Sequence, residues 1–294
     1  MSSTTSSEAL TRRKQLLTDG YTVVPQVFEQ PVLEYFKRWT TRYFAKHGSD
    51  PRFRYQGSDI KVYSPACWAT GMPRRTLLAR ADGPSHLKRI FPDAMATQFV
   101  TSASLRTACD ALGLQPMTSD MGMVTVLSKP GHGPPLYWHQ DFMDWNHPIA
   151  TTPWPTRIFL GIYLTDTSIE RGCLRIIPGT HRKRIDLHDL LPDAHEKEIK
   201  ETALNTPAFM ERSDAVDLPM RAGDLVVCDA RTLHGAHANA SGERRTMLLA
   251  WHDVFPFPDP PSWWKGPIPD IVRHAPRLER SERFKQRRPG VYLT

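Results

Sequence analysis

The amino-acid sequence predicts a mainly β fold with flanking α-helices, an antiparallel barrel or jelly roll wrapped by N-terminal helices. Two observations predict this class. Apolar residues recur at helical spacing before Met121, and after it the pattern changes to many short strands separated by turns. Hydrophobic residues make up 40% of the chain, which is enough for a sizeable core. No internal repeat or linker divides the strands, so we expect residues 1–294 to form a single domain.

The chain opens with a predicted helix and a short strand. Residues 8–19 carry three leucines, and Gly20 stands where a glycine commonly ends a helix. The Tyr-Thr-Val-Val run at 21–24 then favours a strand. Because the start of the chain is rich in Ser and Thr, we expect residues 1–14 to form a flexible N-terminus.

Two further helices are predicted before the strand region. Pro31 is placed to open one of them. A second covers residues 101–112 and ends at Gly113. Between the two, residues 47–98 are rich in Pro, Gly and Arg, so we expect long loops there with short helices. The helix at Pro31 has an aromatic stripe that is more typical of a core face than of a cofactor site, made of Val32, Phe36, Trp39, Tyr43 and Phe44.

In the strand region, branched apolar residues recur at every second position, as expected for a β-strand. The clearest case is residues 157–166, in which Ile158, Leu160, Ile162 and Leu164 share one face. Residues 187–215 are polar and helix-prone, which indicates an excursion between strands. The remaining predicted strands are 124–128, 174–177, 225–228 and 245–254.

Composition and charge limit where in the cell the protein is expected and which partners it is expected to bind. The formal net charge is +7, and basic residues concentrate at 273–288. A positive tail in solvent and an attraction to an anionic substrate or nucleic acid both fit this charge. No apolar run is long enough to span a bilayer, and residues 1–8 lack the apolar core of a secretory signal. We therefore expect a cytoplasmic protein with no membrane partner, and the sequence leaves its oligomeric state open.

The last segment, residues 256–294, is expected to be a C-terminal extension that ends in the basic tail. Trp263 and Trp264 lie in it, and Trp145 lies in similar Pro-rich surroundings. A lid over an apolar substrate and the packing of a loop onto the barrel both explain these tryptophans.

One short stretch, Trp-His-Gln-Asp, combines two potential metal ligands. Side chains of an extended strand alternate between two faces, so His139 and Asp141 are expected to point the same way. An imidazole and a carboxylate on one face are two of the three ligands in the facial triad of non-haem Fe(II) proteins. The pair also arises by chance and needs a third ligand. The candidate is His234, which follows a predicted strand and precedes the paired Arg244 and Arg245.

Several motifs together resemble the phytanoyl-CoA dioxygenase family of Fe(II)/2-oxoglutarate-dependent oxygenases. The resemblance covers roughly residues 15–255. Phosphate-cradling glycine motifs are absent, which argues against nucleotide chemistry. The motifs that carry the resemblance are Asp19–Pro25, Trp138–Asp141, Gly172–His181, and His234-Gly235 followed by Asn239 and Arg245.

The resemblance implies a double-stranded β-helix, the jelly-roll or cupin-like barrel. It also implies Fe(II) held by His139, Asp141 and His234, with 2-oxoglutarate and O₂ as co-substrates. The arginine that binds 2-oxoglutarate in the family follows the second histidine by eleven residues, which falls on Arg245. Thr125 and Lys129, on the strand before the ligand loop, are further candidates for the co-substrate shell, and a structural role explains each as well.

Strand alternation favours Arg245 over its neighbour Arg244. Arg245 shares one strand face with Met247, Leu249 and Trp251, so it is expected to point into the barrel while Arg244 points out. A guanidinium group is also the natural partner for the far carboxylate of a dicarboxylate.

The chain departs from the family pattern at Gly161, where related sequences commonly carry a tryptophan. Loss of a large side chain opens the pocket wall in one interpretation. In the other, a different aromatic residue such as Trp138 or Trp251 fills the same space.

The resemblance implies an enzyme that oxidises a small organic substrate, of the specialised-metabolite kind, while 2-oxoglutarate yields succinate and CO₂. Two alternatives belong to other classes. A nucleic-acid dealkylase with the same iron chemistry needs a base-flipping pocket and a phosphate-tracking surface. Basic residues here cluster in a tail, so nucleic acid is not the expected partner. A metal-binding cupin-type barrel without oxygenase activity has no need of Arg245.

Overall fold

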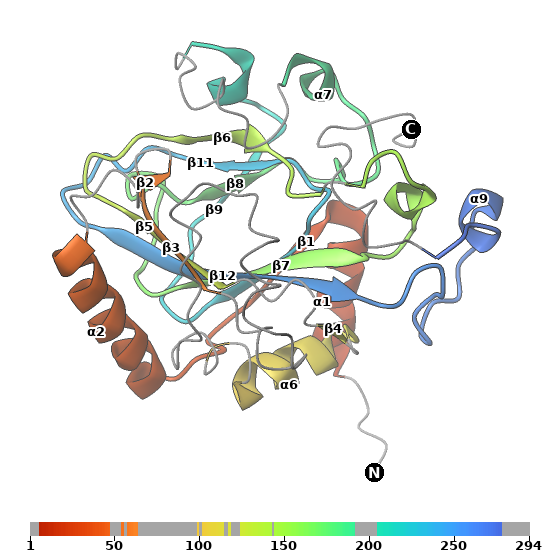
Figure 1. The fold of residues 1–294 in the computed structure, drawn as a ribbon, viewed down its shortest axis with the longest axis horizontal. Helices are drawn as coiled ribbons and strands as arrows, with labels where there is room; N and C mark the ends of the chain where they lie inside the picture. Colours follow the sequence, from red (N-terminus) through yellow and green to blue (C-terminus); the bar gives the residue numbers. More distant parts are fainter. Residues whose placement is uncertain are drawn as a thin grey trace, which may run out of the picture.

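The structure, a computed structural model, describes residues 6–47, 54–55, 58–63, 99, 102–114, 117–118, 124–142, 144–191 and 205–277. Two antiparallel sheets dominate it, with the smaller sheet above the larger one in Figure 1. The predicted class, mainly β with flanking helices, is confirmed. Among the described residues, no helix combines the length and the apolar character that crossing a membrane requires.

The larger sheet has eight strands, and many of its neighbours are far apart in the sequence. Its order is β1-β10-β7-β12-β5-β3-β2, and β4 pairs with β12. Such pairing of early with late strands is what a jelly-roll barrel requires. The strands are β1 (Tyr21–Val24), β2 (Arg54–Tyr55), β3 (Ser58–Tyr63), β4 (Met117–Thr118), β5 (Val124–Lys129), β7 (Arg157–Tyr163), β10 (Leu225–Asp229) and β12 (Arg245–Val254).

The smaller sheet has the order β6-β11-β8-β9, and all of its pairings are antiparallel. Its strands are short. They are β6 (Leu136–His139), β8 (Leu174–Ile176), β9 (Val216–Leu218) and β11 (His234–Ala236).

Helices precede and interrupt the strands. The helix α1 begins after Ser6, whose side chain accepts a hydrogen bond from the Ala9 amide, and ends at Gly20 with a left-handed φ of 84°. Residues 7–14 belong to this helix, so the expectation of a flexible N-terminus is wrong for them. The helices are α1 (Ser7–Asp19), α2 (Gln30–His47), α6 (Ala103–Ala111), α7 (Leu187–Leu190) and α9 (Asp270–Arg273), with 3₁₀ turns at η4 (Pro148–Thr151) and η5 (Pro207–Phe209).

The larger sheet is covered on both faces, which is why all seven residues of β7 are buried. Its outer face, including Ile158, Leu160 and Ile162, packs in one core with Leu16 of α1 and Phe36 of α2. Figure 1 shows α2 and α6 on this side, away from the smaller sheet. The alternation predicted for residues 157–166 is therefore real, although the strand already ends at Tyr163.

The inner face of the larger sheet points toward the smaller sheet. Phe159, Tyr163 and Met247 pack there in a second core with Leu174 and Ile176 of the smaller sheet. The candidate site lies between the sheets, because its residues come from the inner faces of both.

The tryptophans of the C-terminal extension pack on the helical side. The Trp263 indole donates to the Gly113 carbonyl at 2.8 Å, and the Arg13 guanidinium lies 4.9 Å from the ring. Trp264 lies beside Trp154, and both Trp264 and Trp145 contact the core of the outer face. These contacts match the packing of a loop rather than a lid over substrate. The basic tail beyond residue 277 lies outside the described residues.

Candidate active site

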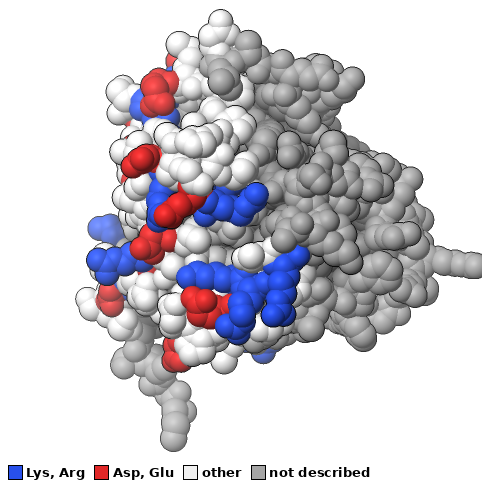
Figure 2. Space-filling view, turned by 90° about the vertical axis from the view of Figure 1, so that its left-hand side faces the viewer, with Lys and Arg blue, Asp and Glu red and all other residues white. Residues whose placement is uncertain are grey.

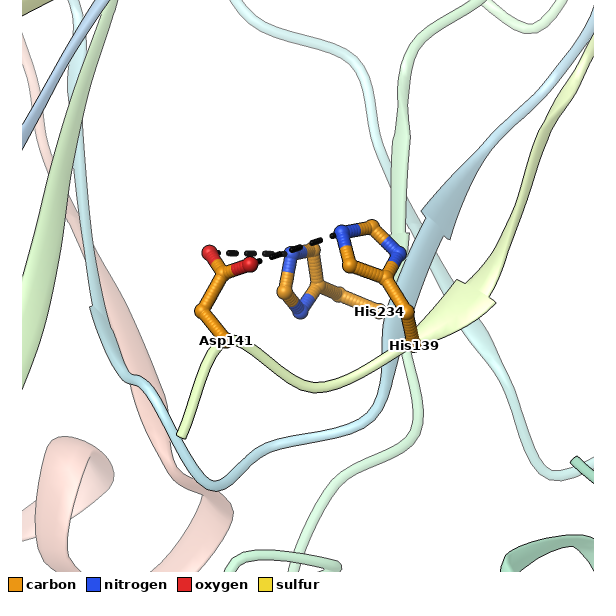
Figure 3. A group of neighbouring side chains, drawn as sticks. All are labelled: His139, Asp141 and His234. Atoms are coloured by element: carbon orange, nitrogen blue, oxygen red, sulfur yellow. Dashed lines mark ion pairs between the residues drawn. The ribbon is translucent and has the colours of Figure 1, made fainter. Parts of the chain in front are cut away.

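Two histidines and one aspartate converge between the sheets (Figure 3). His139 ends β6, and its backbone partner across the smaller sheet is His234, which begins β11. The Asp141 carboxylate lies 3.6 Å from Nε2 of His139 and 3.7 Å from Nε2 of His234. The structure therefore brings together all three residues expected to hold a metal.

Backbone carbonyls set the orientation of both rings. Nδ1 of His139 donates to the Tyr137 carbonyl at 2.9 Å, and Nδ1 of His234 donates to the Thr232 carbonyl at 3.0 Å. A carbonyl only accepts, so Nδ1 carries a proton, and in the neutral imidazole the lone pair on Nε2 then faces Asp141. In histidines that bind metals, one ring nitrogen typically binds the metal while the other donates a hydrogen bond to a carbonyl or carboxylate, as Nδ1 does here.

The three donor atoms fit a divalent metal ion. The nitrogen–oxygen separations of 3.6 and 3.7 Å are longer than hydrogen bonds. A metal ion that lies roughly 2 Å from each donor atom fits between donors that are separated by these distances. Two neutral imidazoles and one carboxylate are also the donor set of the iron facial triad.

Asp141 reaches this position in a different way from the one predicted. The strand β6 ends at His139, so strand alternation does not place the carboxylate. Instead, the amides of Asp141 and Phe142 both donate to the Ala230 carbonyl at 3.0 Å, in the turn after β10. Between the two ligands, the buried Gln140 side chain donates to the carbonyl of Arg231 in the same turn.

That turn is itself anchored by a buried ion pair. The side chains of Arg231 and Asp229 are 1% and 2% exposed and lie 2.6 Å apart. The Arg231 guanidinium also donates to the carbonyls of Ala150, Thr152 and Trp154. A charge network of this kind fixes the ligand loop to the barrel, because every donor of the guanidinium has a defined acceptor.

Arg245 begins β12 on the inner face and is 3% exposed, whereas Arg244 is exposed and donates to the Ser128 carbonyl at 3.3 Å. This placement follows the alternation expected for the strand. One terminal nitrogen of Arg245 donates to the Tyr163 hydroxyl at 3.0 Å, and its buried Nε has no hydrogen-bond partner in the described part of the chain. An unpaired buried donor marks a place where an acceptor is missing.

Lys129 is the backbone partner of Arg245 on β5 and is 2% exposed. Its ammonium donates to the His237 carbonyl at 3.0 Å. Burial, and then the charge of Arg245, hold the pKa of Lys129 well below its usual value. Thr125 lies on the same strand, opposite Leu249, but its side chain falls outside the described part of the structure.

Two adjacent buried cations are costly unless an anion joins them. Among the ion pairs formed by described residues, none includes a carboxylate bound to Arg245 or Lys129. The arrangement fits a bound carboxylate from a small molecule.

Tyr163 is a site residue that the sequence reasoning missed. It is fully buried on β7, its ring lies 5.5 Å from the Arg245 guanidinium, and its hydroxyl accepts from that group. Burial raises the pKa of the phenol, so it stays protonated and keeps a proton to donate. Strand alternation already places Tyr163 on the face opposite Ile158 and Leu160, but its position next to Arg245 depends on the pairing of β7 with β12, which puts Tyr163 opposite Met247.

Comparisons with known proteins identify the family. The model of the phytanoyl-CoA dioxygenase (PhyH) family matches residues 16–247. The chain belongs to the phytanoyl-CoA dioxygenase family. An ectoine dioxygenase from Bordetella parapertussis is 28% identical over 153 residues, which is 49% of each chain. This chain thus spans about half the length of the curated relatives it matches.

Solved structures share the fold. EctD from S. alaskensis, solved with 2-oxoglutarate and 5-hydroxyectoine, has a TM-score of 0.54 at 17% identity and covers 98% of this chain and 90% of its own. The epimerase SnoN, solved with Fe³⁺, α-ketoglutarate and nogalamycin RO, has a TM-score of 0.52 at 19% identity and covers 94% and 97%. The double-stranded β-helix expected from the sequence is therefore confirmed.

Gly161, the position at which the resemblance led us to expect a departure from the family pattern, does not open a wall. A Cβ atom there would lie 2.9 Å from the Met247 methyl and 2.9 Å from a Val226 methyl, with Leu249 next. The space is filled by these aliphatic side chains. Neither the opened pocket wall nor the replacement by Trp138 or Trp251 describes it.

A second group of potential metal donors consists of Cys173, Asp217 and His237. Nε2 of His237 lies 2.8 Å from the Asp217 carboxylate, and Nε of Arg175 donates to the same oxygen at 3.0 Å. Burial raises the pKa of the Cys173 thiol to about 11, so it is not a thiolate. This group is explained by its own ion pairs, because a guanidinium already neutralises the carboxylate.

Proposed function

We propose that this phytanoyl-CoA dioxygenase family member is an Fe(II)/2-oxoglutarate-dependent dioxygenase that hydroxylates or otherwise oxidises a small organic substrate. The observation that carries the proposal is a three-donor metal site together with two buried basic side chains, Arg245 and Lys129, between the same two sheets; neither has a carboxylate partner among the described residues. His139, Asp141 and His234 hold the iron. Arg245 and Lys129 bind the far carboxylate of 2-oxoglutarate, and Tyr163 supports Arg245. We also retain Thr125, on the same strand as Lys129, as a weaker member of this shell.

The residues divide the work of the reaction between them. Fe(II), with 2-oxoglutarate and O₂, supplies the oxidant for a C–H bond and leaves succinate and CO₂. Arg245 and Lys129 orient the co-substrate by its carboxylate, which is a strong charge-assisted contact. Phe159 lies 4.9 Å from the His234 ring, where it would help to keep water from a metal held by this histidine.

The substrate we propose is a specialised metabolite with an apolar part. Leu249 and Trp251 are half-buried on the inner face of β12, where they offer apolar contact beside the metal ligands. Relatives named ectoine dioxygenase support a small-molecule substrate. The described cysteines are buried free thiols, which supports the reducing setting of the cytoplasm.

The alternatives receive less support. Nucleic-acid binding calls for a continuous basic surface. On the face in Figure 2, Lys and Arg side chains lie beside Asp and Glu side chains. Several surface arginines are paired with carboxylates, for example Arg212 with Asp186 and Asp214. A metal-binding barrel without oxygenase activity binds no 2-oxoglutarate, so it does not explain why Arg245 and Lys129 are buried together.

The proposed function is tested by succinate formation. Purified protein with Fe(II), 2-oxoglutarate, O₂ and ascorbate is expected to release succinate slowly even without its primary substrate, and a panel of small organic candidates is expected to speed this release. Failure to bind 2-oxoglutarate in the presence of Fe(II) would overturn the proposal.

Lys129 gives a prediction about pH. Because its pKa is lowered, the ammonium loses its proton at a lower pH than an ordinary lysine does. The charge that attracts the carboxylate is lost with the proton. The KM for 2-oxoglutarate is therefore expected to rise with pH in the wild type. Lys129→Met should have a raised KM that no longer follows this rise, measured by succinate release across the pH series.

Lys129→Arg is the matched control, because a guanidinium keeps its charge over the whole range. It should show a low KM without the pH dependence. A pH profile in Lys129→Met that equals that of the wild type would remove Lys129 from the co-substrate shell.

A further inference from the structure

Trp251 connects the larger sheet to the metal carboxylate. It lies on the inner face of β12, opposite Phe159 of β7, and is half-buried. Its indole Nε1 lies 2.8 Å from Oδ2 of Asp141, which is within hydrogen-bond distance. The indole N–H is a donor only, so the direction of this hydrogen bond is defined.

The two oxygens of Asp141 therefore have different surroundings. Oδ1 faces Nε2 of His139 at 3.6 Å. Oδ2 faces Nε2 of His234 at 3.7 Å and also accepts the indole N–H. A carboxylate binds a metal through one oxygen or through both. An oxygen that accepts a strong hydrogen bond is a poorer second ligand, because a lone pair is already engaged.

We propose that Trp251 is a positioning residue that holds Asp141 in one-oxygen binding of the metal. The inference rests on the proposed function and deepens it. With one oxygen bound, the three protein donors would leave the remaining positions on the ion open to the co-substrates. A carboxylate bound through both oxygens takes a fourth position and competes with 2-oxoglutarate.

The chain offers a matched comparison in Trp138. This residue precedes His139 on β6, and its indole donates to the Met210 carbonyl at 2.9 Å. Its ring lies 5.2 Å from the Arg175 guanidinium. Trp138→Phe thus deletes an indole hydrogen bond beside a metal ligand without touching the carboxylate, whereas Trp251→Phe deletes the bond to Asp141.

The experiment is an anaerobic titration of each full-length protein with Fe(II) and 2-oxoglutarate, followed by the visible charge-transfer absorption of the 2-oxo acid bound to iron. We expect Trp251→Phe to weaken the binding of 2-oxoglutarate to the Fe(II)-loaded protein by about tenfold, a size typical of lost partners of metal ligands, while Fe(II) itself still binds. Trp138→Phe should match the wild type. Thermal unfolding of each variant shows whether it is folded, and Trp251→Leu repeats the comparison with another apolar side chain.

The outcomes separate the two proposals. Wild type without the absorption band would overturn the proposed function, and the role of Trp251 with it. Suppose that the wild type shows the band, and that Trp251→Phe and Trp251→Leu develop it at the same Fe(II) and 2-oxoglutarate concentrations. This result would overturn the role of Trp251 but not the proposed function. Equal weakening in Trp138→Phe would also overturn it, since the effect would then follow from the loss of any nearby indole.

Discussion

His234→Ala is expected to reduce 2-oxoglutarate turnover to the detection limit while the protein remains folded. The imidazole supplies one of three donors, and it comes from β11, across the smaller sheet from His139. Loss of one donor leaves an incomplete site for a metal that has only three protein ligands. Succinate release at saturating Fe(II), together with Fe(II) binding at equilibrium, measures the effect. His139→Ala and Asp141→Ala should behave in the same way.

His237→Ala is the control for this experiment. His237 lies three residues after His234 and is also part of a group of potential donors, but its Nε2 is paired with Asp217. Its carbonyl, which holds Lys129, is backbone and survives the substitution. Turnover should persist in His237→Ala. The assignment of the metal ligands would be wrong if His237→Ala lost turnover and His234→Ala kept it.

Arg245→Ala is expected to raise the KM for 2-oxoglutarate by roughly ten- to a hundredfold, because a charge-assisted contact of about 1.5–3 kcal/mol is lost. The guanidinium is 3% exposed, its Nε lacks a partner among the described residues, and Lys129 alone would remain to bind the carboxylate. Initial rates of succinate formation over a 2-oxoglutarate series measure the change.

Arg244→Ala is the matched control, since it removes the same kind of side chain one position away. Arg244 is exposed and faces the other side of β12. Its substitution should leave the KM close to that of the wild type. The reverse ranking of the two variants would mean that the co-substrate binds on the opposite face of the strand.

Local patterns in the sequence predicted much of this fold. Residues 157–163 form a nearly continuous apolar run, which is typical of a strand whose two faces are covered by different cores, as both faces of β7 are. The end of α1 was predictable because Gly20 adopts a left-handed φ that other residues rarely adopt. Alternation along β12 placed Arg245 inside and Arg244 outside.

Contacts between segments that are far apart in the sequence could not be predicted from these local patterns. Asp141 is placed by the Ala230 carbonyl, and Tyr163 is next to Arg245 only because of the register between β7 and β12. The role of Trp263 depends on a contact with Gly113, which the sequence places far away. Strand register and loop docking are set by the tertiary structure, so no local pattern contains them.

The most direct measurement is a crystal structure of the protein grown anaerobically with Fe(II) and 2-oxoglutarate, with an anomalous difference map at the iron edge. We predict one iron peak among His139, Asp141 and His234, with the far carboxylate of 2-oxoglutarate on Arg245. An iron peak at Cys173, Asp217 and His237 would contradict the account. So would a 2-oxoglutarate molecule bound away from the inner face of β12.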